Sequence, residues 1–358
     1  MPTMFNSSLS NLFISNSYSS SHIIQTPVMK FSTTFLIHRS HFSKFVNGFS
    51  FCVKFGCFRD VSFNMFLNSA LEFNSMEIFS NKSYDTQQVY RDNQIFIHHC
   101  TFMKCQSVRG GAIAGTQINF TVTDCVFSGN RAKVGGAVLV NRTTFVYYER
   151  ILFFNNSAEY SASSHTDSHS ESNNSYLNLV NVSYNHADKW TGGLRIDRAG
   201  GNMTNCCFVF NNAVAAGGFF DFSWNPSRRN VFFCLFMNNT ARSRGAAYTC
   251  SHIMECTRIE NCVFIRNFCE MQVHSISVET IDQNITVSTC LFDGPKEKHI
   301  AMRYGRSYLV IENCQFDADP SILHKNELEI INRIAQNPPI IKQNDIYLYF
   351  GLEADTMF

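Results

Sequence analysis

Residues Cys125–Val140, CVFSGNRAKVGGAVLV, place a cysteine, a phenylalanine, an asparagine and a glycine pair ahead of a run of aliphatic residues. On its own, the glycine pair is compatible with a phosphate-binding loop. Such a loop continues with lysine and then serine or threonine, and no glycine pair in this sequence has that continuation. The alternative is that the segment is one copy of a structural repeat, which predicts further copies at regular intervals.

The segment recurs along the chain. Cysteine with phenylalanine two residues later is found seven times, whereas a composition of 14 cysteines and 35 phenylalanines predicts about 1.4 by chance. The recurrence is therefore a property of the fold. The seven pairs are Cys100/Phe102, Cys125/Phe127, Cys206/Phe208, Cys234/Phe236, Cys262/Phe264, Cys290/Phe292 and Cys314/Phe316.

Degenerate copies fill the gaps between these pairs, with apolar residues in the same two positions. Successive copies are then 24 to 29 residues apart. A unit of this length, made of short apolar runs between asparagine and glycine residues, cannot bury its apolar face alone, so like units must stack. The degenerate copies are Met76/Ile78 with Asn81, Ile151/Phe153 with Asn156, and Val180/Val182 with Asn185.

Coils of parallel strands fit this repeat better than a leucine-rich repeat, because neither a leucine-spaced motif nor a return helix is present. We predict an all-β fold, a right-handed parallel β-helix solenoid of about ten or more coils with 24 to 29 residues each and a short C-terminal helical cap. We expect residues 1–30 to be disordered or to form an N-terminal cap. Residues 31–319 are predicted to form the β-helix, with the clearest repeats in 76–319, and residues 320–358 to cap it.

Weaker signals support both ends of this prediction. The stretch SHFSKF at Ser40–Phe45 resembles CTFMKC at Cys100–Cys105, which indicates weaker coils towards the N-terminus. Near the C-terminus, Leu328, Ile331 and Ile334 have helical spacing, and a proline pair follows them. We interpret this helix as the cap of the last coil, the alternative being a partner-binding helix.

Each repeated position has a predicted structural role. Residues two apart on a strand point to the same side, so the cysteines and phenylalanines should form core ladders. The asparagines should bond from coil to coil at a turn: Asn130, Asn156, Asn185, Asn211, Asn239 and Asn267. The glycines should let the chain turn through conformations that a Cβ forbids: Gly110, Gly111, Gly135, Gly136, Gly192, Gly193, Gly217 and Gly218.

The FxxN and GGA elements of FSGNRAKVGGAV, Phe127–Val138, resemble the repeats of chlamydial polymorphic outer-membrane proteins. They are also similar to repeats of pectin-lyase-like β-helix proteins in parasitic protists such as trichomonads. The resemblance covers residues 76–319. It implies a right-handed parallel β-helix, a secreted or surface-displayed location and a role in adhesion.

Bulk properties exclude several classes of function. The chain is 45% hydrophobic and 16% charged with a net charge of +1, so it is a folded protein without the basic surface of a nucleic-acid-binding protein. The sequence contains no run of about 18 apolar residues, so it predicts no membrane-spanning helix. The first residues lack the basic and apolar regions of a signal peptide, which predicts a cytosolic location. The resemblance implies a secreted or surface location, so the two indications disagree on the compartment.

Pectin-lyase-like β-helices include polysaccharide lyases and glycoside hydrolases, so an enzyme is the alternative. Glycoside hydrolysis needs converging carboxylates, and a calcium-dependent lyase needs several acidic ligands. The repeats contain few acidic residues, and neither an Asp-Asp nor a His-Gly pair occurs. Arg195, Asp197 and Arg198 form a tight mixed cluster, which we interpret as a surface ion pair.

Two further patterns are weighed for metal binding and redox chemistry. His165, Asp167, His169 and Glu171 alternate possible metal ligands, but a solvated serine-rich loop is the favoured interpretation, and no metal or cofactor is predicted. The ladder cysteines are predicted to be reduced, because they occupy a repeating core position and no CxxC spacing occurs. The pairings Cys206/Cys207 and Cys250/Cys256 remain open.

The sequence favours a non-enzymatic structural or interaction protein, adhesin-like and monomeric, whose flank is presented to protein or glycan. The alternative is a carbohydrate-active enzyme of the pectin-lyase-like superfamily with unknown catalytic residues. Three or more carboxylates, or carboxylates with arginine or lysine, gathered in one groove would favour the enzyme.

Overall fold

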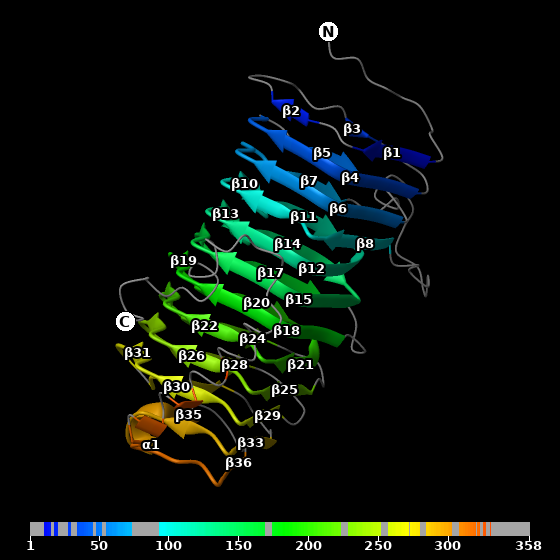
Figure 1. Ribbon diagram of the computed structural model, residues 1–358. Helices are drawn as coiled ribbons and strands as arrows, with labels where there is room; N and C mark the ends of the chain where they lie inside the picture. The colour runs from blue at the N-terminus through cyan, green and yellow to red at the C-terminus, as the bar shows by residue number, and fades with distance from the viewer. Residues whose placement is uncertain are drawn as a thin grey trace, which may run out of the picture.

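A computed structural model describes residues 11–15, 18–20, 28–29, 34–45, 48–51, 55–73, 93–168, 174–222, 228–251, 257–271, 273–279, 284–302, 308–319, 321–322, 325–326 and 330. These residues form an all-β parallel β-solenoid whose strands stack one above another from the N-terminal to the C-terminal part (Figure 1). The predicted fold class and the parallel stacking are confirmed.

The first sheet has 18 strands, and it forms the most extensive wall of the solenoid. Its strands are β1 (Asn11–Ser15), β2 (Tyr18–Ser20), β4 (Thr34–Ser43), β6 (Phe55–Asn64), β8 (Asn93–His98), β9 (Thr101–Met103), β12 (Ile118–Ser128), β15 (Phe145–Phe154), β18 (Asn174–Ser183), β21 (Gly200–Thr204), β22 (Cys207–Val209), β25 (Arg229–Phe232), β26 (Leu235–Met237), β29 (Thr257–Glu260), β30 (Val263–Ile265), β33 (Asn284–Ser288), β34 (Leu291–Phe292) and β36 (Tyr308–Glu312).

The other two walls contain fewer strands. The second sheet has 11 strands: β3 (Val28–Met29), β5 (Phe49–Phe51), β7 (Leu71–Phe73), β11 (Ile113–Thr116), β14 (Val138–Thr143), β17 (Ser164–Ser168), β20 (Leu194–Asp197), β24 (Phe219–Phe222), β28 (Tyr248–Ser251), β32 (Ile276–Glu279) and β35 (Ile300–Met302). The third sheet has seven: β10 (Gln106–Arg109), β13 (Arg131–Val134), β16 (Ser157–Ala158), β19 (His186–Ala187), β23 (Asn212–Ala213), β27 (Thr240–Ala241) and β31 (Phe268–Cys269).

One turn of the solenoid passes through all three walls. From β11 the chain enters β12, bends inside it at Asp124, where φ is +54°, and continues through β13 to a corner before β14. Each strand pairs in parallel with its counterpart one turn later, so that Phe127 lies level with Phe153. This register brings residues about one repeat apart into direct contact.

The core is a continuous column inside the three walls. One cluster of buried apolar residues extends from Ile37 to Ile300 and contains ladder residues of every repeat between them. The alternation of buried and less buried residues in β12 shows why these sequences form strands: every second side chain contributes to the column.

The number of coils is somewhat lower than predicted. The solenoid has about eight turns, fewer than the ten or more predicted. The second sheet nevertheless has 11 strands, because turns near both ends keep pairing there without adding a strand to the third sheet. The turn preceding Cys100 comes from β6, in which Ser62 and Phe63 pair with Thr101 and Phe102. The copy assigned to Met76 lies outside the described residues.

The N-terminal segment contributes strands to the same stack. β1 and β2 both pair with β4, and β3 pairs with β5. Within β4, Ser40 and Phe42 lie level with Val61 and Phe63, which continues the ladder upwards from Phe102. The resemblance of SHFSKF to CTFMKC therefore corresponds to equivalent positions two turns apart, with Val61 and Phe63 of β6 between them.

Helix is scarce in the described residues. α1 (Lys296–His299) leads directly into β35. In the segment expected to form the cap, the described helical residues are Ser321, Ile322, Lys325, Asn326 and Ile330. Ile330 is buried in a cluster with Val263 on the outer side of the first sheet, so this part of the segment packs on a flank of the stack. Leu328, Ile331 and Ile334 lie outside the described residues.

Candidate functional site

The predicted cysteine and phenylalanine positions face the solenoid core. The phenylalanines stack face to face from turn to turn; the ring centroids of Phe102 and Phe127 are 4.9 Å apart, and those of Phe264 and Phe292 are 4.9 Å apart. The residues buried in the core cluster are Cys100, Cys125, Cys206, Cys234, Cys262, Cys290, Phe102, Phe127, Phe208, Phe236, Phe264 and Phe292, and Cys314 and Phe316 pack against it partly buried.

The asparagines form a ladder of buried amides inside the wall. Asn156 Nδ2 donates to Asn185 Oδ1 (3.0 Å) and to the carbonyl oxygen of Phe127 (3.0 Å). Its Oδ1 accepts from the backbone N–H and the Nδ2 of Asn130, both at 3.0 Å. The same side-chain bonds link Asn185, Asn211, Asn239 and Asn267. The ladder satisfies itself, so it is a structural element and not a surface for a partner.

The turn glycines need two different explanations, and the predicted one holds only for some. Gly110 and Gly135 have φ of +56° and +64°, a region that glycine tolerates best. The other predicted glycines have no positive φ. They are required because a Cβ would collide with the backbone of the next turn, 2.0 Å from the Ala162 carbonyl oxygen at Gly136 and 2.7 Å from the Gly217 carbonyl oxygen at Gly192. The same reason applies to Gly111, Gly193, Gly217 and Gly218.

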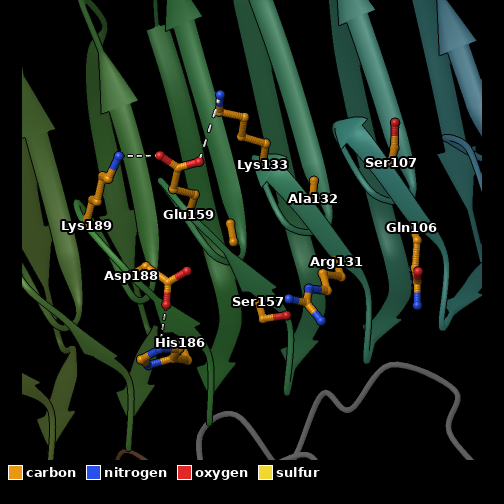
Figure 2. A pocket seen from close by; sticks show the side chains of 11 residues that line it. Gln106, Ser107, Arg131, Ala132, Lys133, Ser157, Glu159, His186, Asp188 and Lys189 are labelled. Carbon is orange, nitrogen blue, oxygen red and sulfur yellow. Dashed lines mark hydrogen bonds and ion pairs between the residues drawn. The ribbon is translucent and has the colours of Figure 1, made fainter.

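A shallow groove with a polar lining lies on the outer side of the third sheet. Its volume is about 640 Å³. We call it the third-sheet groove and define it by its lining: Gln106, Ser107, Arg131, Ala132, Lys133, Ser157, Ala158, Glu159, His186, Asp188 and Lys189. Figure 2 shows that these side chains come from successive strands, with charged groups of both signs along the groove.

Ion pairs between turns determine the electrostatics of this groove. Lys133 and Lys189 approach Glu159 from opposite sides, with 4.0 Å between Lys133 Nζ and Glu159 Oε2 (Figure 2). Lys189 lowers the pKa of the Glu159 carboxyl, and Glu159 raises the pKa of the Lys189 amine. His186 Nε2 lies 3.2 Å from Asp188 Oδ1. The Glu159 and Asp188 carboxylates therefore face the groove in contact with lysine or histidine side chains.

The grooved surface continues along the sheet towards the C-terminal turns. A second hollow of about 360 Å³ shares His186 and Asp188 with the first. Its lining includes Val214 and Phe268, which are 41% and 56% exposed. The third sheet thus presents polar and apolar groups in a row that crosses several turns.

The mixed cluster predicted at Arg195, Asp197 and Arg198 forms ion pairs with its neighbours. Asp197 lies 2.8 Å from Arg195 Nε and 3.0 Å from His165 Nε2, and Arg198 pairs with Asp167. Burial alone would raise the pKa of the Asp197 carboxyl, but His165 and Arg195 outweigh it and lower that pKa. His169 and Glu171 lie outside the described residues. The structure thus places His165 in a hydrogen bond with Asp197, and Asp167 in an ion pair with Arg198.

Sequence reasoning missed a row of imidazole and carboxylate side chains at the bend of the first sheet. His98, His99 and Asp124 bring potential ligand atoms within 4.8 Å of one another, and Asp60 lies beside them. The available signal was weak: each acidic or imidazole residue stands within two positions of a core residue of the repeat. Their proximity depends on the register between turns, which the spacing of the cysteines alone does not reveal.

The cysteines that the structure describes are free. Cys206 belongs to the core column, whereas Cys207 lies in the outer apolar cluster, and Cys250 is buried. Cys256 lies outside the described residues. Burial raises the pKa of the Cys105 thiol to about 12 and the pKa of the Cys125 thiol well above its usual value. These thiols are poor nucleophiles because the thiolate is disfavoured.

No protein-family model matches the sequence, and no curated protein or solved structure matches it either. The described residues contain no helix with the length and apolar character needed to cross a bilayer.

Proposed function

We propose that the protein is a non-enzymatic, adhesin-like interaction protein whose third-sheet groove binds a segment of protein or glycan. The observation that carries this proposal is the row of exposed charges and apolar side chains that repeats along successive turns. A repeating flank suits an extended ligand, because equivalent contacts recur once per turn along the solenoid. The resemblance to polymorphic outer-membrane protein repeats supports the same role.

The lowered pKa of the Glu159 carboxyl in the groove favours ligand binding over hydrolysis as the function of the groove. A glycoside hydrolase needs one carboxylic acid whose pKa is raised so that it can protonate the leaving group. Glu159 has a lowered pKa because Lys189 holds its ionised form. Asp221 is an aspartate whose pKa burial raises, but its side chain is fully buried and points into the core beside Arg229. Carboxylates of the groove thus suit recognition of charged or hydroxylated ligands.

The proposal is tested on defined arrays of polysaccharides and peptides, using the full chain and a charge-reversal variant. We expect Lys133→Glu to weaken binding by up to about fivefold, since an exposed charge pair contributes up to about 1 kcal/mol. Arg258→Glu is the matched control, because Arg258 is exposed on β29 of the first sheet and its substitution changes the net charge equally.

Two outcomes contradict the proposal. Equal loss of binding in both variants would show a nonspecific charge effect rather than recognition in the groove. Release of shortened or unsaturated oligosaccharides from a polysaccharide by the wild-type chain would establish the enzymatic alternative.

A further inference from the structure

Two neighbouring histidines point to the same side at the bend of the first sheet. Successive side chains of a strand normally alternate between its two faces. His98 ends β8, and His99 has φ of +51°, which interrupts the alternation. The two imidazole rings consequently lie against each other, with 3.8 Å between their centroids.

Asp124 occupies the equivalent bend one turn later, with φ of +54°. Its Oδ2 atom lies 3.5 Å from His98 Nδ1 and 3.8 Å from His99 Nε2. Ligand atoms that surround a tetrahedral zinc ion at 2.0–2.1 Å are about 3.3 Å apart, so small side-chain rotations suffice to place all three around one ion. Two imidazoles and a carboxylate suit zinc and neighbouring transition metals rather than calcium or magnesium.

A second carboxylate supports the cluster from the turn on the other side. Asp60 Oδ1 lies 3.4 Å from His99 Nδ1, the nitrogen that faces away from Asp124. A carboxylate on the outer nitrogen of a metal-binding histidine fixes the ring and increases the basicity of the inner nitrogen. Asp60 therefore has the place of a positioning residue for His99.

The remaining contacts are compatible with a bound cation. Arg150 donates to Asp124 Oδ1 at 2.6 Å and to Oδ2 at 2.8 Å. A carboxylate offers about four acceptor positions, so Asp124 keeps capacity for a metal while Arg150 holds its orientation. The hydrogen bond between Thr123 Oγ1 and His98 Nδ1, at 2.6 Å, has to break when His98 Nδ1 binds the metal.

We propose that His98, His99 and Asp124 bind one divalent transition-metal ion of the zinc class. Three protein ligands leave a coordination position open to water or to a ligand group of another molecule. The site lies on the first sheet and is independent of the function proposed for the third-sheet groove.

The test titrates the metal-free full-length chain with Zn²⁺ against a competing chelator and follows stoichiometry and affinity. We expect one tight equivalent in the wild type and its loss in His98→Ala and His99→Asn; asparagine tolerates the left-handed backbone at position 99. Asp60→Asn should weaken binding by about 10-fold or more without changing the stoichiometry. His186→Ala removes an exposed histidine of the third sheet and should bind as the wild type does.

Co²⁺ absorption separates this site from binding by cysteines. The proposal requires visible d–d bands without thiolate-to-cobalt charge transfer. Thiolate charge transfer, or Zn²⁺ affinity unchanged in both folded histidine variants, would overturn it. Circular dichroism establishes that each variant is folded, and His98→Ala, at a half-exposed position, keeps the test decisive if His99→Asn does not fold.

Discussion

At the scale of single residues, the buried asparagine amides make the strictest demands on the sequence. Asn185 Oδ1 accepts from the backbone N–H of Asn156 at 2.8 Å and from Asn156 Nδ2 at 3.0 Å. Its own Nδ2 donates to the carbonyl oxygen of Phe153 and to Asn211 Oδ1. No other small side chain offers both donors and an acceptor in this geometry, so each asparagine is needed by the turns above and below it.

We expect Asn185→Ala to lower the free energy of unfolding by several kcal/mol, because each buried group left without a partner costs about 1–3 kcal/mol. The matched control is Asn212→Ala, at an exposed position on β23. That substitution should stay within about 0.5 kcal/mol of the wild type. Urea unfolding of the two variants measures both free energies. Equal losses of unfolding free energy would show that the ladder bonds contribute no more to stability than surface contacts do.

At the scale of an element, the tight corner before each strand of the second sheet is set by backbone proximity. At Gly136 a Cβ would lie 2.0 Å from the Ala162 carbonyl oxygen and 2.6 Å from that of Ser157. Gly129, at the turn before the asparagine, is different: its φ is +64°, but the nearest atom to a Cβ is a Lys104 side-chain carbon at 3.6 Å. Gly136 is required because a Cβ has no room there, and Gly129 is required because its backbone is left-handed.

This contrast predicts different costs for the same substitution. Gly129→Ala should destabilise the protein by about 1–2 kcal/mol, the cost of a left-handed conformation with a Cβ. Gly136→Ala should cost clearly more, because the backbone of two turns must move apart. Unfolding midpoints of the two variants measure the difference, and a smaller effect at Gly136 would mean that the corner widens without strain.

At the scale of the whole molecule, the core is one uninterrupted column rather than separate domains. Buried residues from Ile37 to Ile300 belong to one apolar cluster. Each turn contacts only its neighbours, so protection of a thiol in the middle of the column depends on the turns directly above and below it remaining stacked. Cys125 and Cys234 are therefore reporters of stacking at two separate places in the column.

We expect a thiol reagent at pH 9 to leave Cys105, Cys125 and Cys234 unmodified until denaturant unfolds the chain. Burial raises the pKa of all three thiols, to about 12 for Cys105, so the reactive thiolate does not form at that pH in the folded state. Among the described thiols, Cys57 and Cys314 are only half-buried and should react before these three. Peptide mapping by mass spectrometry identifies the labelled sites, and early modification of Cys125 would contradict the continuous core.

The predictability of the fold and of the candidate site differs for a physical reason. The positions of Cys125 and Phe127 were predictable because a buried position excludes polar residues in every turn. The bend residues were not, because a left-handed conformation is occupied by Asp124, Arg150, Leu179 and Phe233 alike. Stacking between turns offsets its cost there, so no single residue type marks it. The third-sheet groove was equally hidden, since exposed positions accept many side chains.

The sequence by itself determined that like units stack in parallel, because the recurring cysteine, phenylalanine and asparagine have roles only when each copy lies on the next. Only the tertiary structure decided which turns are neighbours. Val61 lies level with Cys100, 39 residues away, because the segment between β7 and β8 is longer than the usual connection between turns. That register brings Asp60, His99 and Asp124 together, because residues that lie level in neighbouring turns are in contact.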